Sequence, residues 1–128
     1  MPALITAEWR RLRRAVRIAT KTVPGAERDH ALHEVRKRAK RLRYAAETAL
    51  PLSRKRAIRI GRFAQKLQTI LGQQHDSVIA RERLLRRGGV DAYLHGENTF
   101  SYGRLHALEQ QKATDAEARF WRAWRRRP

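Results

Sequence analysis

Apolar residues recur along the first half of the chain at steps of three and four, the spacing of one face of an α-helix. The first series predicts a helix that stops near Pro24 and Gly25; its members are Ile5, Trp9, Leu12, Val16, Ala19 and Val23. A second helix is expected from about residue 26 to residue 50, where Pro51 closes it. Its apolar face consists of Leu32, Val35, Ala39, Leu42 and Ala46.

The same spacing continues through the second half. A third helix, expected to end at Gly72, carries the apolar residues Ile60, Phe63, Leu67, Ile70 and Leu71. Asp76 is expected to cap a short fourth helix through Arg87, which Gly88 and Gly89 would terminate. We expect residues 90–97 to form a loop and Asn98 or Thr99 to cap a last helix. The apolar positions of that helix are Leu105, Leu108, Phe120, Trp121 and Trp124.

These helical periods, with no run of alternating apolar and polar residues typical of a strand, predict the fold class. We expect an all-α protein, an antiparallel helical bundle of four to five helices with short connections. A chain of 128 residues suits a single domain, so we assign residues 1–128 to one unit. With 41% hydrophobic residues the chain has enough apolar material for a core, and its charge does not imply disorder.

The charge of the chain indicates what kind of partner it binds. The chain has 30 Lys and Arg against 12 Asp and Glu, a net charge of +18, and residues 1–87 hold +16 of it. Arg outnumbers Lys by 24 to 6, and a guanidinium can bind two phosphate oxygens at once. This composition predicts an anionic partner, and most simply a polyanion.

Several classes of protein are excluded by what the chain lacks. Without cysteine there can be no disulfide, thiolate zinc site or cysteine nucleophile. The N-terminus has no apolar segment of signal-peptide length, and no stretch approaches the roughly 20 apolar residues that span a bilayer. We expect a cytoplasmic protein that does not enter membranes.

Three of the expected helices carry basic residues at the margin of the apolar face. At about 100° per residue, the second helix places a polar arc of roughly 120° beside its apolar arc, formed by His33, Arg36, Lys37, Lys40, Arg43, Tyr44 and Glu47. The other two helices repeat this arrangement with Lys55, Arg59, Arg62 and Lys66, and with Arg10, Arg13, Arg17 and Lys21. Packing of the apolar faces would let the three basic faces converge on a shared groove. The alternative is that long Lys and Arg stems simply cover apolar surface.

Two segments resemble a known family. The run from His33 to Glu47, HEVRKRAKRLRYAAE, resembles the signature helix of the CHAD family, the conserved-histidine α-helical domain. The run from Lys66 to Val78, KLQTILGQQHDSV, is similar to the second motif of that family. Both occur in order at compatible spacing, and the resemblance covers about residues 9–87.

The resemblance implies a helical domain that binds inorganic polyphosphate in a basic groove, often at polyphosphate granules. The residues it implies for binding are His33, Arg36, Lys37, Lys40, Arg43 and Tyr44, with Arg62 and Lys66 from the facing helix. The basic faces add Arg59, Arg13 and Arg17 to this set. The family domain has two helical repeats, and this chain resembles only the C-terminal one. We therefore expect two chains to pair as a homodimer that rebuilds the double repeat.

We expect binding rather than catalysis. Phosphoryl transfer normally needs carboxylates for Mg²⁺ and a glycine-rich loop, and the sequence offers neither, so no catalytic residue, cofactor or metal is assigned. His30 and His33 could formally share a metal, but His33 is expected to donate a hydrogen bond to phosphate. We expect His75 in a turn, Glu47 as a partner of Arg43, and the aromatic residues, Tyr44 included, in packing.

The alternative function is a nucleic-acid-binding module. The segment from Arg38 to Arg43 could serve as a basic recognition helix. Such a helix usually carries Asn or Gln among its base-contacting residues, and this segment has none.

Overall fold

The computed structural model describes residues 2–51, 54–96 and 99–128, with the side chain of residue 92 left out. Its helices are α1 (Ala3–Lys21), α2 (Ala26–Ala49), α3 (Arg54–Arg83), α4 (Asp91–Leu94) and α5 (Phe100–Arg125), and a π-helical segment, η1 (Leu84–Val90), joins α3 to α4. No strand occurs in these ranges. The all-α prediction is confirmed.

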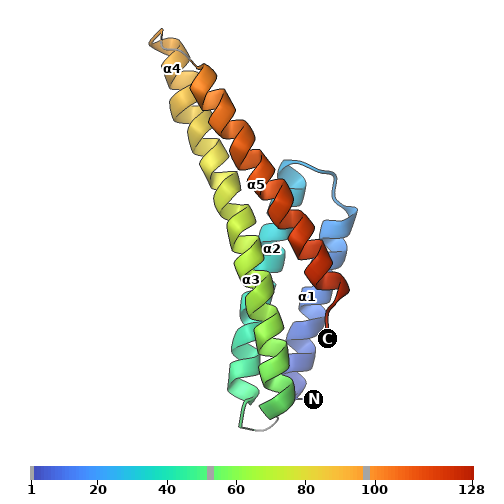
Figure 1. The fold of residues 1–128 in the computed structure, drawn as a ribbon. Helices are drawn as coiled ribbons and strands as arrows, with labels where there is room; N and C mark the ends of the chain where they lie inside the picture. The colour runs from blue at the N-terminus through green and yellow to red at the C-terminus, as the bar shows by residue number, and fades with distance from the viewer. Residues whose placement is uncertain (1, 52–53, 97–98) are drawn as a thin grey trace.

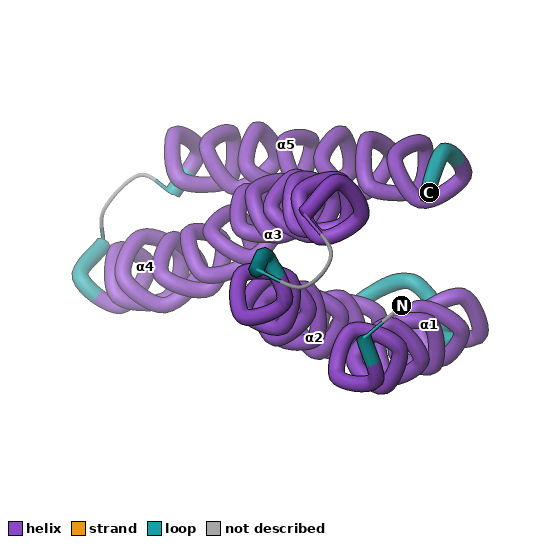
Figure 2. Tube along the Cα trace, turned by 90° about the horizontal axis from the view of Figure 1, so that it is seen from below, coloured by secondary structure: helices purple, strands orange, loops and turns teal. Residues whose placement is uncertain are grey.

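The four long helices pack in an order that leaves α2 and α3 in the middle. α1 packs on α2, α2 on α3, and α3 on α5, with neighbours antiparallel (Figures 1 and 2). Gly25 separates α1 from α2 at φ +122°, a backbone conformation that glycine adopts without strain. The outer helices α1 and α5 meet through aromatic side chains, since the rings of Trp9 and Trp124 stack at 5.8 Å.

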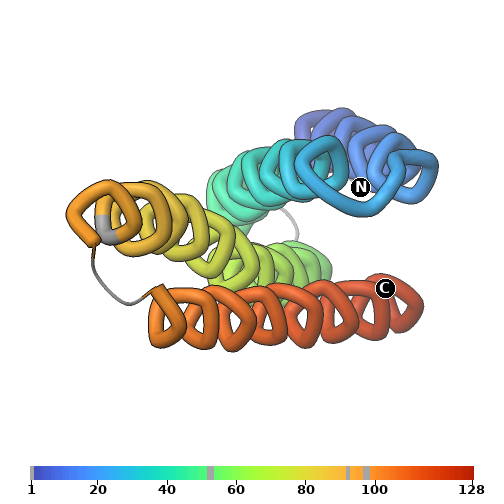
Figure 3. The backbone as a smooth tube through the Cα atoms, turned by 90° about the horizontal axis from the view of Figure 1, so that it is seen from above, coloured from blue at the N-terminus to red at the C-terminus, as the bar shows by residue number. Residues whose placement is uncertain are grey.

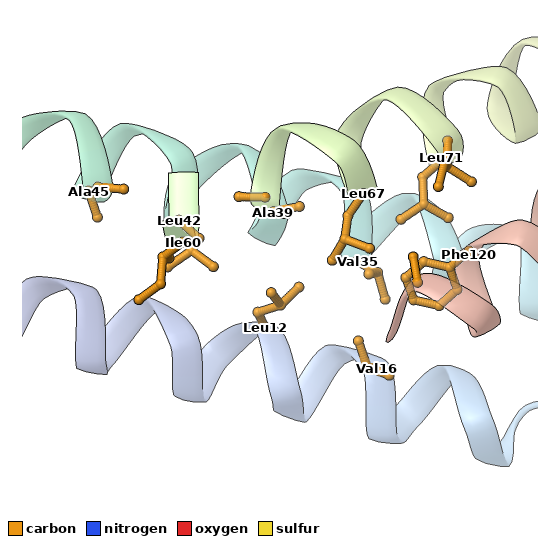
Figure 4. Close-up of a cluster of buried hydrophobic side chains, with 14 of the residues drawn as sticks. Leu12, Val16, Val35, Ala39, Leu42, Ala45, Ile60, Leu67, Leu71 and Phe120 are labelled. Carbon is orange, nitrogen blue, oxygen red and sulfur yellow. The ribbon is translucent and has the colours of Figure 1, made fainter. Parts of the chain in front are cut away.

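One apolar core holds the bundle together. Leu12 and Val16 of α1 face Val35, Ala39 and Leu42 of α2 in Figure 4. The core also takes in side chains from α3 and α5, among them Ile60, Leu67, Leu71 and Phe120. All five apolar positions predicted for α2 are buried, and Trp9, Trp121 and Trp124 pack against the core as expected. The exception in the first half is Val23, which lies beyond the end of α1 and is exposed.

The prediction that the third helix ends at Gly72 is wrong. α3 continues to Arg83, so His75 and Asp76 lie inside a helix, and Asp76 caps nothing. Tertiary contacts explain the continuation. Gln74 is buried and donates a hydrogen bond of 2.8 Å to Asp29 of α2, and α5 packs along the same stretch. These contacts outweigh the helix penalty of a glycine, about 1 kcal/mol.

Gly88 and Gly89 do not end a helix either. Both lie within η1, and the helical path continues to Leu94, inside the region expected to be a loop. A Cβ on Gly88 would lie 1.9 Å from Cδ1 of Tyr102, so the glycine is there to let α5 approach. Thr99 precedes α5 without a capping side-chain bond, and Asn98 lies outside the described residues.

The π-helical segment η1, α4 and the start of α5 project beyond the other helices. Figures 1 and 3 show η1, α4 and the first part of α5 extending past the α1–α2 connection. We call residues 84–96 and 99–108 the arm. Leu105 and Leu108 were expected to mark a buried face, but both are exposed because no third helix covers the arm.

The close contact at Gly88 yields a test of the arm's packing. Gly88→Ala should lower the free energy of unfolding by about 1–3 kcal/mol, because Tyr102 must move to admit a methyl group. Gly103→Ala is the matched control, since a Cβ there meets nothing within 4 Å and alanine favours helix. Urea unfolding followed by circular dichroism measures both variants. Equal stability of the two would contradict the assigned contact.

Candidate anion-binding site

The buried face of α2 determines where its basic residues lie. Because Leu32, Val35, Ala39 and Leu42 point into the core, the polar arc beside them falls at the border with α3. Three contacts place this border. The rings of His33 and His75 stack at 4.1 Å, Arg36 lies against Gly72, and Arg43 donates a hydrogen bond to Gln65.

Two cations of α3 extend the same surface. Arg62 and Lys66 are exposed and lie within one turn of Gln65, the residue that Arg43 contacts. We define the α2–α3 basic strip by His33, Arg36, Lys37, Lys40, Arg43, Arg62 and Lys66. From His33 to Arg43 it follows α2 for about 15 Å, at 1.5 Å per residue.

Most of the charge on this strip is not neutralised. Lys37 forms an ion pair of 3.0 Å with Glu34, and Arg43 lies 3.6 Å from Glu47, the partner expected for it. Four other cations make no ion pair with a carboxylate of the described residues: Arg36, Lys40, Arg62 and Lys66. The strip therefore keeps several like charges close together.

Tyr44 departs from its expected role in packing. Its side chain is 46% exposed and lies outside the core. The guanidinium of Arg43 lies 5.0 Å from the ring centroid, and the ammonium of Lys40 lies 5.9 Å from it. The ring thus holds two cations of the strip near its face.

His33 has an altered proton affinity. Burial lowers the pKa of His33 below its ordinary value, and the charges of His75, Lys37 and Arg36 lower it further. Its Nδ1 atom is buried and has no hydrogen-bond partner among the described residues. A phosphate oxygen near this ring would favour the protonated form, because an opposite charge raises the pKa of an imidazole.

The structure does not bring every predicted residue to the strip. Arg11, Arg14 and Ile18 of α1 border α2, where they line a cavity with Glu34 and Arg38. Arg13 and Arg17 lie on the other side of α1, the side from which Trp9 reaches α5. The basic face of α1 therefore points away from the strip.

Arg59 also has a different setting. It lines a cavity of about 360 Å³ at the base of α3, together with Trp9, Lys55 and Arg56. None of the side chains of the strip lines this cavity or the α1–α2 cavity. Lys37, Lys40, Arg62 and Lys66 are exposed, which places the strip on the surface of the molecule.

The described residues contain neither a cluster of metal ligands nor a membrane-spanning helix. Within the residues described, no three His, Asp or Glu side chains gather in a way that could hold a metal ion. His30 lines the α1–α2 cavity, whereas His33 faces His75, so the two do not converge. None of the described helices is both long and apolar enough to cross a membrane.

The facing surface of α3 was missed by reasoning from the sequence. Gly61, Gln65, Gln68, Gly72 and His75 recur at steps of 4, 3, 4 and 3, a stripe of small and polar residues on one helix face. A Cβ on Gly61 would lie 3.4 Å from Ala46, and a Cβ on Gly72 would lie 3.5 Å from the guanidinium of Arg36. The signal is visible only if the helix is read through Gly72.

Comparison with known proteins places the chain among relatives. The CHAD domain family model matches residues 1–85. Two proteins of Mycobacterium tuberculosis, from strains CDC 1551 and H37Rv and each described as uncharacterized, are 41% identical over 119 residues. The match covers 91% of this chain and 21% of each relative, so the chain spans about a fifth of their length. No solved structure matches significantly.

The lowered pKa of His33 predicts how stability responds to acid. The unfolded chain takes up this proton at higher pH than the folded chain does, so stability is full above the unfolded pKa of about 6.5 and falls below it. We expect His33→Gln to lose less stability than the parent between pH 7.5 and pH 5.5 in urea titrations. The control is His95→Gln, an exposed histidine of the arm. An identical acid loss in His33→Gln and the parent would refute this role.

Proposed function

The chain belongs to the CHAD domain family, and on that premise we propose that it binds inorganic polyphosphate along the α2–α3 basic strip without transforming it. CHAD domains are associated in general with polyphosphate binding. The observation that carries the proposal is the set of cations from two helices that no described carboxylate neutralises: Arg36, Lys40, Arg62 and Lys66. An anion that bridges the two helices would relieve their repulsion.

The shape of the strip suits a polymer. A chain of phosphates carries a regular series of negative charges, and an open surface about 15 Å long can contact several of them at once. Guanidinium groups bind phosphate oxygens with charge-assisted hydrogen bonds, which are stronger than neutral ones. Each cation neutralised also releases counterions from the polymer, which favours binding at low salt.

His33 would couple this binding to pH. In the free protein its neutral form is favoured, because burial and the neighbouring cations lower its pKa. A polyanion bound along the strip would add negative charge near the ring and stabilise the imidazolium. Binding would then take up a proton, and affinity would rise as the pH falls.

The chemistry of the strip supports binding rather than catalysis. Its side chains donate hydrogen bonds and positive charge. The nearby carboxylates, Glu34 and Glu47, are engaged by Lys37 and Arg43. A group already held in an ion pair is poorly placed to activate a nucleophile.

Two copies of the chain would pair, and the pair would lie where polyphosphate accumulates. The family resemblance implies two helical repeats, and this chain resembles one, so two copies would together offer two strips. A protein that holds long-chain polyphosphate would be found where the polymer accumulates, at cytoplasmic granules. The chemistry that makes or degrades the polymer would belong to another protein.

Charge reversal on both helices tests the strip. Lys40→Glu combined with Lys66→Glu should weaken the binding of long-chain polyphosphate more than tenfold at 0.15 M salt, because each charge-assisted contact contributes about 1.5–3 kcal/mol. The slope of log K against log salt should also become shallower. The matched control is Arg41→Glu with Arg83→Glu, which makes the same charge change at exposed positions of α2 and α3 outside the strip. Titration calorimetry measures both.

Two outcomes would overturn the proposal. Equal losses in the two double variants would show that net charge alone attracts the polymer. Duplex DNA that displaces polyphosphate at matched phosphate concentration would favour the nucleic-acid-binding alternative. The helical circular dichroism of each variant verifies that the fold is intact.

A further inference from the structure

The arm exposes large apolar side chains on both of its legs. Tyr93 and Leu94, at its tip, are 76% and 72% exposed, and Leu85 is exposed on η1. Leu105 and Leu108 are exposed on the facing leg, the first turns of α5. A concentration of exposed apolar residues on one projecting element is typical of an interaction surface.

The arm also contains a hollow next to these projecting groups. A cavity of about 410 Å³ lies between its two legs, lined by Leu84, Leu85 and Tyr93 on one leg and by Tyr102, Gly103 and His106 on the other. A Cβ on Gly103 would meet nothing within 4 Å, so the hollow is open at this point. Projecting and receding groups thus share one surface, as self-association about a twofold axis requires.

Charge indicates which partner fits. Residues 88–108 contain Asp91, Glu97 and Arg104, a net charge of −1, although the whole chain carries +18. The remainder therefore carries +19, so most of its surface would repel a second copy. Residues 88–108, which follow Arg86 and Arg87 of η1, form a segment where two identical chains can approach with little of this repulsion.

We propose that two copies of the chain pair arm to arm, with the exposed Leu85 and Tyr93 beside each hollow packing against the arm of the other chain. Two antiparallel hairpins packed in this way form a four-helix bundle, which covers the apolar side chains that neither arm can bury alone. Tight packing at Gly88 against Tyr102 keeps the two legs together. The strips of the two chains, on the bodies of the molecules, remain accessible.

This inference takes up the proposed pairing and names its surface, but it does not depend on polyphosphate. The two interactions respond oppositely to salt. Salt screens the repulsion between the cationic bodies and strengthens apolar association, whereas it weakens polyanion binding. Failure of one proposal is therefore distinguishable from failure of the other.

Sedimentation equilibrium without any polyanion tests the pairing. At 10–100 µM protein and 0.15–0.5 M NaCl we expect a dimer, more stable at the higher salt. Leu85→Glu with Tyr93→Glu should weaken dimerisation more than tenfold and leave polyphosphate affinity per chain unchanged. Leu4→Glu with Ile18→Glu is the control, because both residues are exposed apolar side chains of α1, far from the arm. A parent chain that stays monomeric under all these conditions would overturn the proposal.

Two further variants avoid any loss of folding. Gly103→Leu has open space within the chain and favours helix, but its side chain would occupy the hollow, so dimerisation should weaken while thermal stability of the monomer is kept. Because the chain has no cysteine, a single one reports contacts without background. Tyr93→Cys should form covalent dimers under mild oxidation faster than Ile18→Cys. Equal rates, or unchanged dimerisation in Gly103→Leu, would refute the arm as the surface.

Discussion

The burial of one narrow face of α2 is the constraint on which the rest of the structure depends. Leu32, Val35, Ala39 and Leu42 are fully buried between α1 and α3, and this fixes the rotation of the helix about its own axis. Small residues at the contact, Ala46 against Gly61, bring the backbones of α2 and α3 close together. The basic residues of α2 lie beside its buried face on the helix surface. The close packing of α2 on α3 therefore places these cations next to α3.

The second constraint is that α3 continues without a break from Arg54 to Arg83. This continuation places His75 against His33. It also places Gly72, which has no side chain, against the guanidinium of Arg36. It also carries the chain past the end of the bundle, where η1 and α5 continue as a two-legged arm. A helix that ended at Gly72 would have produced neither the contact between His33 and His75 nor the arm.

The charge distribution separates the molecule into two regions. The body holds its cations at the margin of the core, where like charges repel one another. Burial lowers the pKa of His33, and two of these cations, Lys37 and Arg36, contribute to the lowering. The arm tip is almost neutral and apolar, so it can serve contacts between proteins that the cationic body would oppose.

The sequence by itself determined the all-α class, the core of α1 and α2, and the basic arc of α2, because each follows from the 3.6-residue period within one helix. It also determined the pairing of Arg43 with Glu47, a contact within a single turn. Only the tertiary structure decided that Gly72 and Gly88 lie inside helical segments, that His75 stacks on His33, and that Arg13 points away from the strip. In each case the deciding contact comes from a residue far along the chain, such as Arg36 at Gly72 or Tyr102 at Gly88, and local spacing carries no record of such a contact.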